Sequence, residues 1–318
     1  MSGIEVTGLT RRFGRLTAVD GTSFAVPAGR VAGFLGPNGA GKTTTLEMLA
    51  GLLLPHAGRI RVGDLDPVTQ REQVLAVTGA LIEAPGFFGH LTAEENLLWL
   101  GSLGRATTPA QLRPRVRECL DLLGLTPHAG RPVRGFSTGM RMRLALALAV
   151  LHRPKFLLLD EPTAGLDPLG RRTVRDLVAQ AARADGATAF ISSHQLEEIE
   201  AVCDWLVVID AGRIVAQGPM SELLPTSGGS RFAARIEPLD QAEALLRERT
   251  DLSAIERDGP ELRFRGHREQ IPELVAAAVG RGLRVHELRD LGRSVESFYL
   301  DATKAPGPIG APPPGGKA

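Results

Sequence analysis

Apolar, strand-like segments alternate with helix-like segments over residues 1–224, and turn residues separate them. Pro27-Ala-Gly29, for example, marks a turn between two short apolar runs. This alternation is typical of a layered α/β domain. The expected strands are Ile4–Leu9, Thr22–Val26, Val31–Leu35, Arg59–Val62, Val74–Ile82, Phe156–Asp160, Thr188–Ser192 and a hairpin over Trp205–Ala216. The expected helices are Lys42–Ala50, Pro168–Asp185 and Gln195–Val202.

The pattern becomes helical between about residues 92 and 151. Thr92-Ala-Glu-Glu95 reads as a capping box that opens a helix through Leu100. A second helix is predicted over Pro109–Leu123, ended by Gly124, and a third begins near Gly139. The sequence therefore predicts a helical insertion within the α/β core.

A second domain is predicted after a linker. Residues 225–230 (PTSGGS) have the composition of a flexible connection. Residues 231–302 then show the order β-α-β-β-α-β, which predicts a small ferredoxin-like α+β domain. Residues 303–318 are rich in Pro and Gly, and a disordered tail is expected there. The expected elements of this domain are Arg231–Ile236, Leu239–Glu248, Leu252–Arg257, Glu261–Arg265, Arg268–Arg281 and Leu283–Leu288.

Composition removes several classes of function. A formal net charge of +1 argues against duplex-DNA binding, and 14 aromatic residues (11 Phe, 2 Trp, 1 Tyr) are few for serial base stacking. The longest strictly apolar run, Leu144–Leu151, is far shorter than a membrane span, and residues 1–5 do not open a secretion signal. Cys119 and Cys203 have no metal-binding spacing and are expected to be reduced thiols. We expect no nucleic-acid partner and no membrane crossing by this chain itself.

The strongest chemical motif is GPNGAGKT over Gly36–Thr43, between a predicted strand and a predicted helix. This is a complete phosphate-binding loop in the context that the motif requires. Its glycines allow backbone N–H groups to converge on phosphates, and the helix N-terminus adds partial positive charge. We expect Lys42 to reach the β- and γ-phosphates and the Thr43 hydroxyl to bind Mg²⁺.

Two adjacent acids end a buried strand, and a histidine ends another. Asp160 fits the magnesium shell, whereas Glu161 fits a base that orients and polarises the attacking water. His194 ends the segment 189–194 and could hydrogen-bond a γ-phosphate. Taken alone, His194 is better explained as a structural histidine than as a catalytic one.

Residues 135–139 (GFSTG) match the nucleophile elbow of α/β-hydrolases. That elbow needs a preceding strand, but residues 128–134 are rich in Gly, Pro and Arg. The preferred interpretation is that small residues around Ser137 form an anion site at the start of a helix.

Taken together, these motifs resemble the nucleotide-binding subunit of an ABC transporter over residues 4–224. The resemblance implies an ATP-hydrolysing P-loop NTPase with an antiparallel β subdomain, and it assigns a role to each matching position. Phe13 would stack on adenine and Glu161 and His194 would be catalytic. The nucleotide-binding residues would be Phe13, Gly36, Pro37, Asn38, Gly39, Ala40, Gly41, Lys42, Thr43 and Thr44. The signature motif would be Ser137, Thr138, Gly139 and Met140, and Asp167 would be the last residue of the D-loop. Thr43, Asp160 and Glu83 would hold Mg²⁺.

Two departures narrow the resemblance. The signature keeps Ser137 and Gly139 but has Thr138 and Met140, and Glu83 stands where the family usually has glutamine. Both variations, and the C-terminal βαββαβ unit, are similar to the bacterial drug- and bacitracin-resistance exporters. The resemblance thus implies an exporter of a drug, an antibiotic or a lipid-like substrate.

The resemblance also implies partners. Two ATP-binding subunits, identical or different, would face each other head to tail with ATP between them. A separate integral membrane permease would hold the pair at the cytoplasmic side of the membrane as a peripheral subunit. Phe87 and Phe88 either dock that permease or pack in the core of the insertion.

Three other classes remain as alternatives. A soluble ABC-type ATPase acting on ribosomes or DNA usually has two ATPase units or a long coiled coil, and neither is present in this sequence. A small-molecule P-loop kinase leaves Ser137 and His194 unexplained. An α/β-hydrolase is the weakest of the three.

Overall fold

The computed structural model describes residues 3–83, 86–103, 109–224, 230–292, 298–299 and 309–310. The chain divides into two compact units, Met1–Met220 with Ala302–Ala318, and Ser221–Asp301. Residues 225–229 of the expected linker lie outside the described residues, as does the expected tail apart from Ile309 and Gly310. Each unit is described by itself.

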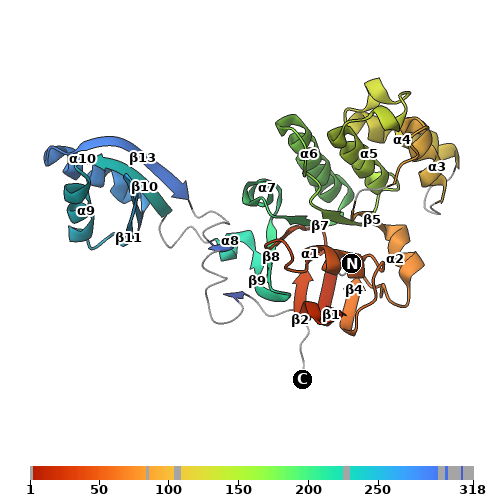
Figure 1. Ribbon diagram of the computed structural model, residues 1–318, viewed down its shortest axis with the longest axis horizontal. Coiled ribbons are helices and arrows are strands. Elements are labelled where there is room, and N and C mark those ends of the chain that lie inside the picture. Colours follow the sequence, from red (N-terminus) through yellow and green to blue (C-terminus); the bar gives the residue numbers. More distant parts are fainter. Residues whose placement is uncertain are drawn as a thin grey trace. The chain divides into compact units, whose positions relative to one another are not determined.

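A seven-stranded sheet forms the centre of the first unit (Figure 1). Its order is β14-β9-β8-β3-β7-β6-β5, with β3, β5, β6, β7 and β8 running parallel and β9 returning antiparallel to β8. The central strands read as continuous apolar runs because both faces of a parallel sheet are covered. Their bounds are β3 Val31–Leu35, β5 Thr78–Leu81, β6 Phe156–Asp160, β7 Thr188–Ser193, β8 Trp205–Asp210, β9 Arg213–Pro219 and β14 Ile309–Gly310.

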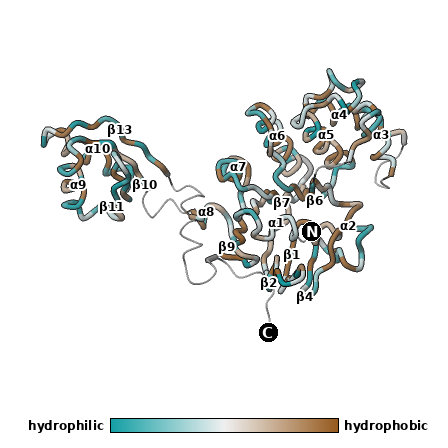
Figure 2. The backbone as a smooth tube through the Cα atoms, in the orientation of Figure 1, coloured by the Kyte–Doolittle hydropathy of each residue, from teal (hydrophilic) through white to brown (hydrophobic). Residues whose placement is uncertain are grey.

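A second, antiparallel sheet covers one side of this centre. It has the order β2-β1-β4, formed by β1 Ile4–Phe13, β2 Leu16–Val26 and β4 Ala57–Val62. Helix α1 (Lys42–Leu49) contributes Leu46 to the core that the two sheets share. Within that core Phe34 stacks on Phe190 with ring centroids 4.8 Å apart. Figure 2 shows hydrophobic segments gathered at β6 and β7, where the layers meet.

The predicted helical insertion is present between β5 and β6. It consists of α3 (Ala93–Leu103), α4 (Pro109–Leu122), two 3₁₀ turns (Thr126–His128 and Val133–Gly135) and α5 (Thr138–Val150). The capping box is confirmed, because Glu95 Oε2 accepts from the Thr92 backbone N–H at 2.8 Å while Thr92 Oγ1 accepts from that of Glu95 at 3.2 Å. These helices share a core with α6 (Pro168–Asp185) on the other face of the sheet.

One predicted strand is partly wrong. Residues 74–77 belong to helix α2 (Arg71–Val77), and only Thr78–Leu81 forms a strand. Val74 is fully buried whereas Leu75 is exposed. The first part of this apolar run therefore forms one face of a helix, and only the second part forms a strand. Helix α7 covers Leu196–Val202 and α8 covers Met220–Leu223.

The second unit contains one antiparallel sheet with the order β11-β12-β10-β13. Every second residue over part of β10, namely Phe232, Ala234 and Ile236, enters a core that α9 and α10 complete. The elements run β10 Ser230–Glu237, α9 Leu239–Glu248, β11 Ser253–Asp258, β12 Glu261–Gly266, α10 Ile271–Gly280 and β13 Arg284–Gly292. The chain order is therefore β-α-β-β-α-β. Among the described residues of both units, no helix is long and apolar enough to cross a bilayer.

Replacing Phe190 with alanine is expected to lower the free energy of unfolding by about 3–5 kcal/mol, since it empties the centre of the core. Phe190 is fully buried and stacks on both Phe24 and Phe34. Urea denaturation followed by circular dichroism measures the change. Val279→Ala, at an exposed position in the second unit, is the control; equal stability of both variants would contradict the prediction.

Candidate functional site

The phosphate-binding loop lies between β3 and α1, as its sequence predicts. Gly41 caps α1 at φ 104°, and a Cβ there would lie 2.4 Å from the Ala18 carbonyl oxygen. A Cβ on Gly36 would lie 2.3 Å from the Ile209 carbonyl oxygen. Glycine is therefore required at both positions, at Gly36 by the close approach of backbone and at Gly41 also by its left-handed conformation.

The Lys42 ammonium is folded back over this loop. Its Nζ donates to the carbonyl oxygens of Gly36 at 2.7 Å and Pro37 at 3.1 Å, and only 7% of the residue is exposed. Burial lowers the pKa of Lys42, and the negative charges of Glu161 and Asp160 oppose that shift. The loop thus holds a largely desolvated cation where a phosphate would enter.

Asp160 joins the loop to the neighbouring strands. Its Oδ2 accepts a hydrogen bond from Thr43 Oγ1 at 2.6 Å, and its Oδ1 accepts one from Ser192 Oγ. Ser192 Oγ also accepts the Glu161 backbone N–H at 3.1 Å. The ends of β6 and β7 therefore bring a hydroxyl and a carboxylate together, in the oxygen chemistry that Mg²⁺ prefers.

Glu161 and His194 are in direct contact. Glu161 Oε2 lies 2.7 Å from His194 Nδ1, with 26% of the Glu161 side chain and 50% of the His194 side chain exposed. Glu161 has φ 47°, so its side chain does not simply alternate with that of Asp160 along a strand. The structure thus places a candidate base and a histidine side by side at the edge of the phosphate-binding loop.

Glu83 follows β5 in the left-handed region, with φ 64°. Burial, then the negative charges of Glu83 and Asp160, raises the pKa of Glu47 on α1. Glu83 and Asp160 lie at the carboxyl ends of β5 and β6, which are adjacent parallel strands. Among the described residues, no three His, Cys, Asp or Glu side chains form a preassembled metal site.

Phe13 lies at the end of β1, beside the hairpin turn to β2. Its ring is 45% exposed on the surface, and the Arg11 guanidinium carbon lies 4.9 Å from the ring centroid. An exposed aromatic ring presents a face on which a base could stack.

Ser137 begins α5 rather than following a strand. Its hydroxyl accepts from the Met140 backbone N–H at 3.2 Å, and a 3₁₀ turn over Val133–Gly135 precedes it. A nucleophile elbow is therefore excluded. Ser137 and Thr138 are exposed and Gly139 and Met140 are half-buried, so the helix N-terminus faces outward from the chain.

The D-loop packs against the start of α5. Asp167 caps α6, because its Oδ1 accepts from the Gly170 backbone N–H at 2.7 Å. A Cβ on Gly139 would lie 3.3 Å from Leu166 Cδ2. Asp167 is therefore engaged as a helix cap, and Leu166 touches the signature segment.

Sequence reasoning missed several residues that organise the site, chiefly Ser192 and Glu198. Ser192 bridges the two acids, and Glu198 accepts from Thr163 and Ser193. The Ser192-Ser193 pair directly before His194 is a sequence signal that could have indicated the hydrogen bonds of Ser192 with Asp160 and Glu161.

The two phenylalanines differ in their surroundings. Phe87 packs partly against the core of the insertion, whereas Phe88 is 38% exposed and makes an edge-to-face contact with Trp99 at 5.0 Å. Trp99 and Leu103 are more exposed still. We call Phe88, Trp99 and Leu103 the insertion patch.

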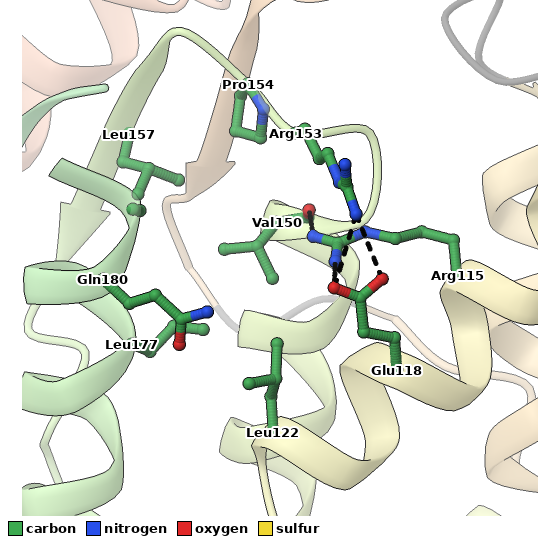
Figure 3. Close-up of a pocket in the computed structure, with 10 residues that line it drawn as sticks. Arg115, Glu118, Leu122, Val150, Arg153, Pro154, Leu157, Leu177 and Gln180 are labelled. Atoms are coloured by element: carbon green, nitrogen blue, oxygen red, sulfur yellow. Dashed lines mark hydrogen bonds and ion pairs between the residues drawn. The ribbon is translucent and has the colours of Figure 1, made fainter. Parts of the chain in front are cut away.

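A cavity of 190 Å³ lies where α4, α5 and α6 meet (Figure 3). Arg115 donates there to the carbonyl oxygens of Val150 at 2.7 Å and Leu151 at 3.0 Å. It also pairs with Glu118 at 2.7 Å, and Glu118 pairs with Arg153 at 3.3 Å. None of the predicted site residues lines this cavity.

Comparison with known proteins gives consistent matches. A family model described as ABC transporter matches residues 19–164. The bacitracin transport ATP-binding protein BcrA of Bacillus licheniformis is 34% identical over 299 residues, covering 93% of this chain and 96% of BcrA. The daunorubicin/doxorubicin resistance ATP-binding protein DrrA of Streptomyces peucetius is 38% identical over 307 residues, covering 93% and 88%. A solved ATP-binding subunit of an ABC transporter superposes with a TM-score of 0.64 at 27% identity, covering 70% of this chain and 92% of that one.

Proposed function

Because this chain belongs to the ABC transporter family of ATPases, we propose that it is the ATP-hydrolysing subunit of an exporter of drugs, antibiotics or lipid-like molecules. The observation that carries the proposal is the similarity to a bacitracin transport ATP-binding protein and a daunorubicin/doxorubicin resistance ATP-binding protein, each over 93% of the chain. The comparisons give no support to the alternative of a soluble ATPase on ribosomes or DNA.

The geometry supports one role for each part of the site. The loop 36–44 would bind the phosphates, Phe13 would stack on adenine, and Glu161 would accept a proton from the attacking water. His194, 2.7 Å from Glu161, would orient that carboxylate and contact the γ-phosphate. The desolvated Lys42 supplies positive charge in a low-dielectric loop, where electrostatic stabilisation is stronger than in water.

The residues around Asp160 fit a magnesium ion. Thr43 and Asp160 present oxygen atoms 2.6 Å apart, and Glu83 adds a carboxylate after the adjacent parallel strand β5. Mg²⁺ is usually held by one or two carboxylates together with substrate phosphates, so a larger preassembled cluster is not needed. When bound, Mg²⁺ would neutralise charge on the β- and γ-phosphates.

A second ATP-binding subunit, identical or different, would complete the site. Ser137, Thr138, Gly139 and Met140 sit at an exposed helix N-terminus, which is suited to an anion. We infer that this N-terminus serves the ATP held by the partner, and that Asp167, next to Leu166, lies at the junction between subunits.

The proposed membrane partner is an integral permease on a separate chain, with this subunit peripheral on the cytoplasmic side. The insertion patch gives it an apolar, aromatic contact surface. Phe88 and Trp99 already pack edge to face and are therefore partly preorganised for binding.

Trp99→Ala is expected to reduce membrane association several-fold. It should not lower the ATPase rate of the purified subunit, because the insertion patch contains none of the predicted nucleotide-binding or catalytic residues. Tagged chains expressed in the native host are compared by membrane fractionation and copurification of a multi-span protein. Val279→Ala, another exposed apolar position, is the control. Equal membrane recovery of the two variants would refute the patch as the docking surface.

Export itself is tested with a strain that lacks this chain, exposed to a panel of amphipathic antibiotics. Wild-type chain is expected to restore resistance to at least one compound, and Glu161→Gln to restore none. Full resistance with Glu161→Gln would overturn ATP-driven export.

A further inference from the structure

The carboxylate of Glu198 connects the two loops that carry Glu161 and His194. Thr163 Oγ1 donates to Glu198 Oε2, and Ser193 Oγ lies 3.1 Å from the same oxygen. Thr163 is two residues after Glu161 and 6% exposed, while Ser193 directly precedes His194 and is fully buried. One carboxylate oxygen, Glu198 Oε2, thus joins segments that lie about thirty residues apart in the chain.

A second connection joins the same two loops. Arg171 on α6 donates through Nε to the Leu166 carbonyl oxygen and through Nη1 to Gln195 Oε1, both at 3.3 Å. The Gln195 backbone N–H in turn donates to Ser193 Oγ at 2.9 Å. The loop from Glu161 to Asp167 and the loop around His194 are therefore held together at two places.

These connections bear on the contact between Glu161 and His194. Glu161 has φ 47°, a conformation that non-glycine residues keep only when the surrounding structure enforces it. Half of the His194 side chain is exposed, so few contacts of the side chain itself fix its position. The residues on either side of His194 must therefore hold its backbone in place. Thr163 and Ser193 are the adjacent restraints, and Glu198 links them.

Stabilisation of helix α7 does not fully explain Glu198. A carboxylate in the first turn of a helix is favourable, and Glu197 occupies that turn as well. Glu198, however, is turned inward, and its Oε1 is buried without a partner among the described residues. Leaving a buried carboxylate oxygen without a partner is unfavourable. Stabilisation of the helix therefore does not explain why Glu198 points inward and contacts two hydroxyl groups through Oε2.

We propose that Glu198 is a positioning residue for ATP hydrolysis: through Thr163 and Ser193 it holds Glu161 and His194 at contact distance. The inference rests on the proposed roles of Glu161 and His194. Glu198 touches neither nucleotide nor water in this scheme, and it acts only through the two loops. Its loss should therefore slow the chemical step and leave ATP binding unchanged.

The test compares steady-state ATPase kinetics of full-length variants. Glu198→Ala is expected to lower kcat about 10-fold with KM for ATP within about twofold, since a small misplacement of a catalytic group is costly. Glu198→Gln keeps an acceptor oxygen and should stay within about threefold of wild type. Glu197→Ala, on the exposed side of the same helix, is the matched control and should not change kcat.

A second pair removes only the hydroxyl. Thr163→Val keeps the shape of the side chain and should lower kcat as Glu198→Ala does, whereas Thr163→Ser keeps the hydroxyl and should retain activity. If the two residues act through one bond, the double variant is no slower than Glu198→Ala alone. If Glu198→Ala does not fold, the comparison of Thr163→Val with Thr163→Ser still tests the positioning role.

Three results would overturn the inference: kcat of Glu198→Ala equal to that of Glu197→Ala, equal kcat for Thr163→Val and Thr163→Ser, or a fully additive double variant. Glu161→Gln measured in parallel separates the two levels. If it loses turnover while Glu198→Ala and Thr163→Val do not, only the positioning role fails. If it retains turnover, the proposed role of Glu161 fails first.

Discussion

Glu161→Gln is expected to lower the ATPase kcat by about 100-fold or more while the affinity for ATP·Mg stays unchanged. Glutamine keeps the size of the side chain and its contact with His194, but an amide cannot accept a proton from water, and general-base catalysis contributes about 10²–10⁴-fold. Phosphate release measures kcat, and fluorescent-nucleotide titration measures affinity. Glu197→Gln, at an exposed position, is the control and should hydrolyse ATP normally.

The same variant should accumulate as an ATP-bound dimer on a sizing column, because hydrolysis would no longer open the pair. ADP in place of ATP should give monomer. Near-normal turnover by Glu161→Gln would contradict the assignment of the base, whatever the column shows.

Mixing Lys42→Ala with Ser137→Arg is expected to restore part of the ATPase activity that each variant lacks alone. Lys42→Ala removes the ammonium group that lies over the phosphate-binding loop, and Ser137→Arg places a bulky side chain at the exposed start of α5. In the mixed dimer one site combines an intact loop with an intact Ser137. The other site contains both the Lys42→Ala and the Ser137→Arg substitution.

The mixture is titrated at constant total protein, and the rate at a 1:1 ratio is compared with the average of the separate variants. A rate above that average supports a site shared between subunits. If Ser137→Arg alone hydrolysed ATP normally at dilutions where the chain is monomeric, the shared site would be wrong. Nucleotide titration of Lys42→Ala should also show weakened affinity, since that charge acts on phosphate itself.

The phosphate-binding loop and the ATPase fold were predictable because their signals are local. The loop from Gly36 to Thr43 needs glycine at fixed positions, and strand β3 and helix α1 follow from the adjacent residues. The capping box at Thr92 is likewise contained within four residues. In each case a short segment determines its own conformation.

Other features depend on contacts that no local pattern encodes. Residues 74–82 are apolar apart from Thr78, and such a run fits a buried strand or one side of a helix until its surroundings are known. Asp160 is the last residue of β6, and Glu161 leaves the strand at φ 47°, a conformation that the apolar pattern of the strand does not predict. The link from Thr163 through Glu198 to Ser193 joins residues distant in the chain and becomes visible only when β6, β7 and α7 are assembled.

Helix α5 is secured by side chains at both ends. Ser137 caps its N-terminus, and Arg115, reaching from α4, caps the carbonyl oxygens of Val150 and Leu151 (Figure 3). A 13-residue helix is about 20 Å long, and caps at both ends suppress fraying of its terminal turns. We therefore expect α5 to move as a rigid unit. A displacement of α4 at Arg115, which contacts the C-terminal end of α5, would move Ser137 at the other end of the helix instead of unwinding the last turn.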